Sequence, residues 1–470
     1  MALTIWLTDR SRYETGVGRC ARLRYLQAHA GPNGYGWARQ AQSMPAVTGT
    51  LIHDPITEGI LRPLMETDER PSDAQIHQAI ASAQLKYRLQ VSSRGLVHTT
   101  DPQELELRVQ EQCTLLEGLV WTWVAAALDQ FHEEWKVIEV EQEHVTVVGC
   151  TCGIGDRLGT AEEHSARSCA GIGWMTRGDC ITQRRTTGTY AYHDFKSTGM
   201  NSGNWRDTWY HRVQVMAGVL GAEDALRATV DPSVTIDEIY IQPLYKGRHA
   251  ATWDPIAKAA VGPKFQDSPL CYGWHRPGNP PMVEEAWAAK YDYVDEDGAK
   301  RRLTKDYTRK GIWTLPEALW KANGALSPSH YWVRWIAPTG VLADVWNPIG
   351  PIYREQWKLD QFLTQMAAEE QQWQSRVWGL YNVASGGSGW ETETFQRALD
   401  TLVPQARGEA CQNAFGDRCS MLPLCNRAEG WQTPEAIGFI ARRPHHTPEL
   451  EQAIGRGLLP PDDGAAEGDE

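Results

Sequence analysis

Two acidic residues, a histidine and a lysine in this sequence have the types and spacing that phosphodiester hydrolysis requires. Asp194 and Lys196 alternate in one strand-like segment and therefore point to the same face. Asp156 ends an earlier hairpin-like segment, and His53 lies in a helix-like segment near the start of the chain. Carboxylates that hold a divalent metal beside a lysine can activate water and stabilise charge on a phosphate. The sequence therefore predicts a metal-assisted hydrolytic site.

The ligands expected at this site favour a hard divalent cation. Mg²⁺ takes oxygen ligands in octahedral geometry and keeps several waters. Asp156 and Asp194 would each supply one oxygen, and the carbonyl of Phe195 would supply another. His53 would bind as neutral imidazole, which favours Mn²⁺ over Mg²⁺. Lys196 would orient the attacking water and stabilise the developing charge.

One further acid is expected from the preceding hairpin. Glu141 is the candidate for a catalytic or metal-binding role there. Glu139 and Glu143 share its face by strand alternation, so the sequence does not choose among the three.

Hydrophobic spacing predicts the elements that must carry these residues. Helices are expected over 8–30 (with Cys20 inside), 48–66, 72–88, 102–132, 205–220, 351–378 and 391–403, and strands over 137–141, 144–149, 189–196 and 236–244. The polar, glycine-rich stretch 160–188 is expected to be an inserted loop. This order predicts an α/β fold with a mixed central sheet flanked by helices.

The run from His53, through Gly155-Asp156-Arg157, to Asp194-Phe195-Lys196 resembles the PD-(D/E)xK nuclease superfamily. The similarity is to its RecB-like branch, which includes CRISPR-associated exonucleases and phage-encoded members. It implies a restriction-endonuclease-like fold that cuts DNA with Mg²⁺ or Mn²⁺.

The same resemblance implies a glutamine on the helix after the catalytic strand, and Gln214 fits that position. The family often has a tyrosine four residues later, where this chain has Gly218. Tyr210, one turn earlier, is the alternative.

Four of the ten cysteines form a second candidate site. Cys411, Cys419 and Cys425 lie close together, and Cys20 precedes the presumed core. Four thiolates can hold either zinc or an iron–sulfur cluster. The spacings lack the Cys-x₂-Cys pairs of a zinc ribbon, although zinc and no metal stay open. The resemblance implies a four-iron four-sulfur (4Fe-4S) cluster that staples the end of the chain to its beginning.

The net charge of −13 argues against a generally basic nucleic-acid binder, but a local basic groove is enough for phosphate contacts. Arg184 and Arg185 precede the catalytic strand, and Arg301 and Arg302 lie in the densest basic stretch. We expect these arginines to contact DNA, and a solvated surface is the alternative. We find no apolar run near the roughly 20 residues of a membrane span, and we expect a cytoplasmic protein.

We divide the chain into five regions by composition and expected elements. They are a helical region with Cys20 and His53 (1–135), a nuclease core (136–250), an irregular aromatic and basic insertion (251–350), a helical region with the cluster cysteines (351–440) and a disordered acidic tail (441–470).

The function that we expect is a metal-dependent deoxyribonuclease in recombination, repair or phage DNA processing, acting as an exonuclease on single-stranded or frayed DNA. Three alternatives stay open. The chain could trim DNA for CRISPR spacer acquisition with integration proteins, bind DNA without cutting it, or act as a redox-responsive iron–sulfur regulator. The oligomeric state and the cleavage polarity are not readable.

Overall fold

A computed structural model of the chain is described here for most of its length. The described residues are 5–96, 99–150, 171–198, 207–245, 348–387, 389–406, 411, 418–444 and 446–455, and a set of short strands between 252 and 335 is described by backbone alone.

A five-stranded mixed sheet forms the centre of the molecule. Its order is β18 (Ile349–Tyr353), β8 (Ile236–Tyr245), β7 (Tyr190–Thr198), β6 (Cys180–Arg184) and β3 (Trp135–Val140). β7 and β8 run parallel, and the other neighbouring strands are antiparallel. The connection from β7 to β8 carries η3 (Trp209–His211), α11 (Val213–Ala217) and α12 (Leu220–Thr229). The predicted mixed α/β architecture is confirmed.

A second, three-stranded sheet joins the N-terminus to the middle of the chain. β1 (Ile5–Asp9) pairs in parallel with β5 (Gly171–Arg177), which pairs antiparallel with β4 (Glu143–Cys150). The prediction of an inserted loop over 160–188 is therefore wrong for its second half, which contains β5 and β6. The glycines of β5 lower its strand propensity, which is why the sequence did not predict a strand there. The strand is stabilised by the burial of Ile172 and Trp174 and by pairing on both of its edges.

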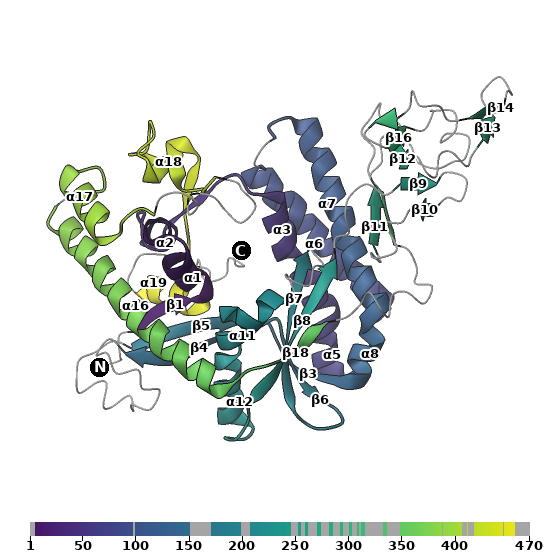
Figure 1. Cartoon of the computed structure of the whole chain (residues 1–470), viewed down its shortest axis with the longest axis horizontal. Helices are drawn as coiled ribbons and strands as arrows, with labels where there is room; N and C mark the ends of the chain where they lie inside the picture. Colours follow the sequence, from purple (N-terminus) through teal and green to yellow (C-terminus); the bar gives the residue numbers. More distant parts are fainter. Residues whose placement is uncertain are drawn as a thin grey trace.

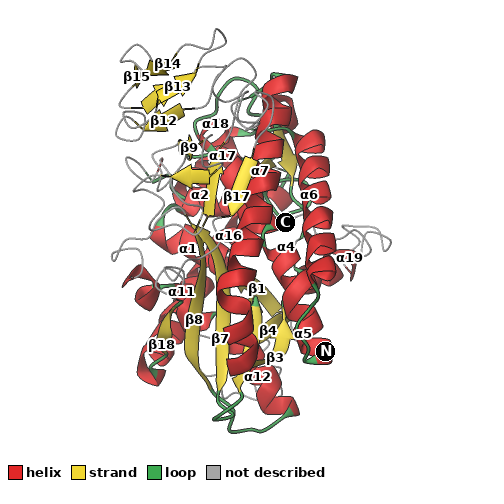
Figure 2. Cartoon of the chain, turned by 90° about the vertical axis from the view of Figure 1, so that its right-hand side faces the viewer, coloured by secondary structure: helices red, strands yellow, loops and turns green. Residues whose placement is uncertain are grey.

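The N-terminal helices pack against one face of the central sheet. They are α3 (Met44–Leu51), α4 (His53–Ile56), η1 (Thr57–Leu61), α5 (Arg62–Thr67), α6 (Asp73–Arg94), α7 (Pro102–Trp123), η2 (Val124–Leu128) and α8 (Asp129–Glu134). The long helices α6 and α7 lie side by side, and the strands of the central sheet lie beside this helical layer (Figures 1 and 2). Ser72 and Gln75 form a capping box that begins α6.

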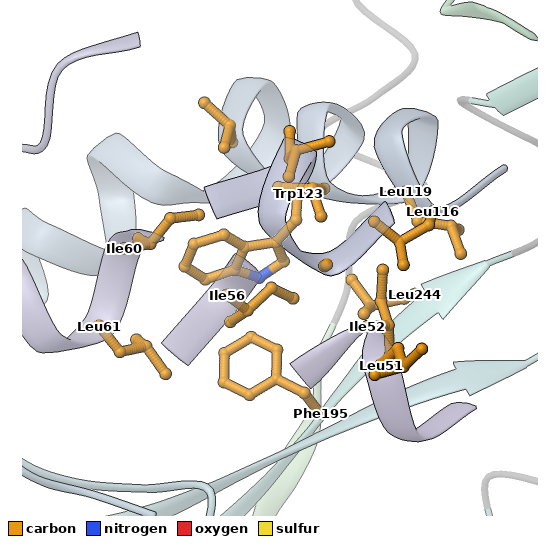
Figure 3. Packing of buried hydrophobic residues seen from close by; sticks show 14 of the residues in the cluster. Leu51, Ile52, Ile56, Ile60, Leu61, Leu116, Leu119, Trp123, Phe195 and Leu244 are labelled. Carbon is orange, nitrogen blue, oxygen red and sulfur yellow. The ribbon is translucent and has the colours of Figure 1, made fainter. Parts of the chain in front are cut away.

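The largest hydrophobic core lies between these helices and β7. Trp123 and Phe195 are both fully buried, and their ring centroids lie 5.3 Å apart in an edge-to-face contact. Ile52 and Ile56 pack beside them (Figure 3). Because Phe195 anchors one face of β7 in this core, the side chains of the opposite face are held in a defined position.

The C-terminal helices return to the start of the chain. The elements are α1 (Arg10–Gly18), α2 (Ala21–Ala28), β2 (Trp37–Arg39), α16 (Gln356–Ser385), α17 (Glu393–Leu402), α18 (Leu422–Cys425), η7 (Pro434–Ile437), β19 (Phe439–Ala441) and α19 (Thr447–Gly455). β19 pairs with β2, and α1, α2, α16 and α17 lie close together (Figure 1). The buried Arg24 donates to Glu370 at 2.7 Å and lies over the ring of Trp373.

The remaining described strands belong to the backbone-only segment. They are β9 (Thr252–Asp254), β10 (Ala259–Val261), β11 (Leu270–Gly273), β12 (Met282–Glu284), β13 (Asp292–Val294), β14 (Lys300–Arg302), β15 (Thr308–Arg309), β16 (Ile312–Thr314) and β17 (Trp332–Trp335). Over the described ranges, no helix has the length and apolar character that crossing a bilayer requires.

Glu143 in β4 attaches the last described helix, α19. It accepts hydrogen bonds from His446 at 3.2 Å and from the Thr447 amide at 2.8 Å. Burial raises the pKa of Glu143, but these hydrogen bonds outweigh burial and lower the pKa to about 2.

This lowered pKa predicts an acid-sensitive attachment. The stability that the Glu143 carboxylate contributes is fully present above its usual pKa of 4.5 and is lost as the pH falls toward about 2. We expect Glu143→Gln to lower the melting temperature at neutral pH and to flatten its fall between these pH values. Glu435→Gln, at an exposed glutamate, is the control, and an unchanged pH profile in Glu143→Gln would contradict the assignment.

Candidate functional site

Strand β7 carries the first two site residues as predicted. Asp194 and Lys196 share one face of the strand, and the Lys196 Nζ donates to the Asp194 Oδ1 at 2.8 Å. The Lys196 Nζ also lies 3.3 Å from the carbonyl oxygen of Phe195. Because side chains alternate along a strand, the Phe195 ring points into the hydrophobic core. The charged groups of Asp194 and Lys196 lie on the opposite face of β7.

The two oxygens of Asp194 have different surroundings. Oδ1 accepts from Lys196, from the Tyr192 hydroxyl at 3.0 Å and from the Gln214 amide. Oδ2 is buried and has no hydrogen-bond partner within the described part of the chain. Burial raises the pKa of Asp194, and the attraction of Lys196 only partly offsets it. A buried, unpartnered carboxylate oxygen is costly, and a cation at Oδ2 would remove that cost.

A second aspartate, Asp179, lies beside Asp194. It precedes β6, and since Cys180 pairs with His193, the antiparallel register sets Asp179 opposite Asp194. Its Oδ2 accepts from the Phe195 amide at 2.7 Å and lies 3.4 Å from the His53 Nδ1.

Asp179, His53 and Glu141 form a candidate metal-binding group. One ligand atom from each lies within 4.8 Å of those of the other two, which holds for no other set of three His, Cys, Asp or Glu residues among those described. The sequence prediction named Asp156 for this role, and Asp156 lies outside the described residues. The missed signal was Gly178-Asp179, immediately before the strand that pairs with β7.

His53 and Asp179 shift the pKa of each other in opposite directions. Burial raises the pKa of Asp179, but the charges of His53 and Lys196 outweigh it and hold that pKa well below its usual range. Burial lowers the pKa of His53, but the charge and hydrogen bond of Asp179 outweigh it and raise the pKa. A metal ligand must be neutral imidazole, so metal binding here would release a proton.

The structure distinguishes the three glutamates that the sequence left open. Glu141 lies in the β3–β4 turn with φ at +46°, an uncommon backbone conformation for a residue with a side chain. It pairs with Arg177, and burial raises its pKa. Glu139 instead contacts His144, and Glu143 binds the C-terminal segment. Only Glu141 of the three belongs to the candidate metal group.

Gln214 begins the short helix α11 and reaches the site as predicted. Its Nε2 donates to the Asp194 Oδ1, while its Oε1 accepts from Arg10. Tyr210, the alternative, is largely exposed. At Gly218, a Cβ would clash with the Gln214 carbonyl oxygen, so a tyrosine there would require a shifted backbone.

The four predicted cluster cysteines converge. Cys20, Cys411, Cys419 and Cys425 line one small cavity together with apolar side chains from α2 and α18. The Cys419 amide donates to the Cys411 carbonyl at 2.7 Å, and the Cys20 Sγ accepts from the Ala406 amide at 3.4 Å. Cys20 is the N-cap of α2, so it lies between two helices and not inside one as predicted.

The spread of these sulfurs bears on which group they could hold. A tetrahedral zinc site with Zn–S bonds of about 2.3 Å sets its sulfurs roughly 4 Å apart. No three of the four cysteine sulfurs lie within 4.8 Å of one another, and the described part of the chain has no other cysteine group at that spacing. Burial raises the pKa of Cys425 to about 12 and also raises that of Cys419. A raised pKa disfavours the thiolate forms of these two residues, so a cationic centre would be needed to ionise them at neutral pH.

Two of the four predicted DNA-contacting arginines, Arg184 and Arg185, do not join this site. Arg184 and Arg185 end β6 at the opposite end from Asp179. Arg184 pairs with Glu134 and Glu238 and lies over the Trp135 ring, and Arg185 pairs with Asp68.

The other two predicted arginines are described less fully. Arg301 and Arg302 lie in β14, of which only the backbone is described. Their contact with DNA stays a prediction.

No protein-family model matches the chain, and no curated protein matches it. The geometry and chemistry of the site therefore carry the functional argument.

Loss of the Asp179 carboxylate should remove metal binding. We expect Asp179→Asn to weaken Mn²⁺ affinity at least tenfold in calorimetry, since the variant keeps the side-chain shape and loses the charge. In the parent protein, protons should be released on binding at neutral pH. If Asp156→Asn abolished Mn²⁺ binding while Asp179→Asn left it intact, the assignment of Asp179 would be wrong.

The cysteine cavity yields its own prediction. Cys419→Ser, prepared without oxygen, should lose iron, brown colour and thermal stability together, because one ligand of the cluster is removed. Cys113→Ala, at a buried cysteine outside the cavity, should keep its iron. Equal iron content in both variants would contradict a cluster at these cysteines.

Proposed function

We propose that this protein is a metal-dependent deoxyribonuclease with a PD-(D/E)xK active site and a restriction-endonuclease-like core. The observation that carries the proposal is the buried Asp194, opposite Asp179 in the β6–β7 pairing. Its Oδ1 is bound by Lys196, while its Oδ2 has no hydrogen-bond partner among the described residues. Two carboxylates and a lysine in this relation are suited to hydrolysing a phosphodiester. The mixed sheet, with Asp179 immediately before β6 and Asp194 on the adjacent β7, supports the fold assignment.

The donors present fit a hard divalent metal. Asp179, His53 and Glu141 would hold it as the group of mutually close donors. The buried Asp194 Oδ2 and the Phe195 carbonyl lie outside that group and would join it only after a local shift. A set of oxygens plus one imidazole suits Mn²⁺ or Mg²⁺. When bound, such a metal would lower the pKa of a water and polarise the scissile phosphate.

The other residues of the chain position the reacting groups. Lys196 donates to Asp194 and to the Phe195 carbonyl, and its third N–H can orient the attacking water and stabilise charge on the phosphate. Tyr192 and Gln214 donate to the same oxygen of Asp194, Oδ1, and so fix the orientation of the carboxylate. Burial of Asp194 and Asp179 strengthens each of these interactions, since water competes less for them.

The cysteine cavity supports a 4Fe-4S cluster with a structural role. Its ligands would join α2 to the segment that follows α17, which lies almost four hundred positions later in the sequence. Closing so long a loop restricts the unfolded chain strongly in the entropic model.

Recombination, repair or phage DNA processing on single-stranded or frayed ends in the cytoplasm remains our proposal for the biological setting. DNA is then the main partner. CRISPR spacer trimming, DNA binding without cleavage and redox regulation remain the alternatives.

The proposal predicts how two variants should behave. Asp194→Ala should abolish cleavage of end-labelled DNA in Mn²⁺ or Mg²⁺, and Lys196→Met should lower the rate by about 10²–10³-fold. Both should still bind DNA. Lys358→Met, at an exposed lysine of α16, is the matched control and should cleave at the parent rate.

The decisive comparison uses anaerobically purified protein with its iron present. Cleavage retained by a clean Asp194→Ala preparation would contradict the site. No cleavage by the parent protein on any DNA, with binding intact, would favour the inert DNA-binding or regulatory alternatives.

A further inference from the structure

Arg10 is joined to the candidate site although the sequence did not indicate it. It is the first residue of α1, whose N-cap Asp9 accepts from the Arg12 amide at 2.9 Å. An Arg10 Nη1 group donates to the Gln214 Oε1, and the Gln214 Nε2 donates to Asp194. A chain of two hydrogen bonds thus connects the guanidinium to the catalytic carboxylate.

The charge of Arg10 distinguishes it from its neighbours. Each of the nearby arginines of α1 and α2 pairs with a carboxylate, namely Arg12, Arg22 and Arg24. Among the described residues Arg10 has no such partner, and its one recorded hydrogen bond is to a neutral amide. The side chain is only partly exposed, and its positive charge acts on Asp194 from a distance without a direct ion pair.

Arg212 is a second arginine close to Gln214 in the sequence. It is the exposed N-cap of α11, two positions before Gln214, and its guanidinium lies 5.7 Å from the Trp209 ring centroid. It too has no carboxylate partner in the part of the chain that is described. Arg10 therefore reaches Gln214 from α1, and Arg212 caps the helix α11 that carries Gln214.

We propose that Arg10 and Arg212 bind backbone phosphates of the DNA strand on the α11 side of the site, an inference that rests on the proposed nuclease function. The planar guanidinium presents five donors that match a phosphate, and Arg10 uses only one of them on Gln214. A phosphate bound there would be positioned relative to Asp194 through Gln214. The two arginines would thus hold the strand in register with the reacting centre.

The test is DNA binding without turnover. In the Asp194→Ala background, fluorescence anisotropy with an end-labelled oligodeoxynucleotide measures affinity over a series of salt concentrations. Each lost phosphate contact should lower the slope of log affinity against log salt by about 0.7 for a single strand. We expect this loss from Arg10→Met and from Arg212→Met, and about twice the loss from the double variant.

Two controls separate charge from structure. Arg10→Lys should keep the slope because it keeps the charge, and Arg397→Met, at an exposed arginine of α17, should match the parent. If Arg10→Met does not fold, judged by its melting curve, the exposed Arg212→Met decides the result alone.

The outcomes distinguish this inference from the proposed function. Salt-dependent DNA binding by the parent, with unchanged slopes in Arg10→Met and Arg212→Met, overturns the inference and leaves the nuclease proposal standing. No DNA binding by the parent overturns both. The inference is supported if the salt slope falls in Arg10→Met and Arg212→Met and stays at the parent value in Arg397→Met.

Discussion

The burial of a carboxylate at the centre of the sheet is the constraint on which the rest of the site depends. Asp194 is fully buried, and burial raises its pKa, so its ionised form requires compensation. Three donors converge on one of its oxygens, and they come from β7 itself and from α11. The packing of Phe195 against Trp123 stabilises β7 from behind. Hydrophobic and polar contacts thus act on opposite faces of one strand.

Sequence reasoning identified the parts of the site that follow from local periodicity. The alternation of Asp194 and Lys196, the helical position of His53 and the place of Gln214 after β7 agree with the structure. It missed Asp179, because the strands on either side of that residue are glycine-rich or short and depend on pairing with distant partners. The sequence also did not indicate that Arg10 reaches the site, because its contact with Gln214 joins residues more than two hundred positions apart.

The convergence of the four cysteines has a different origin. Their spacing in the sequence predicted a shared site, but it could not predict that the segment after α17 packs on α2. That packing comes from the apolar cluster of Leu23, Leu26 and Leu399, with Arg22 paired to Asp400 at its edge. Apolar packing and this ion pair therefore act at the same interface as the four thiols, and a cluster would add to them.

The register of the β6–β7 hairpin restricts how the chain can vary. Asp179 and Asp194 meet only because Cys180 pairs with His193 across a connection that closes between Arg184 and Thr189. A slip of one residue turns every side chain of a strand to the opposite face, so Asp194 and Lys196 would exchange places with Phe195. Single-residue insertions or deletions in this hairpin are therefore far more damaging than substitutions at its tip, and length here is a stricter requirement than amino-acid identity.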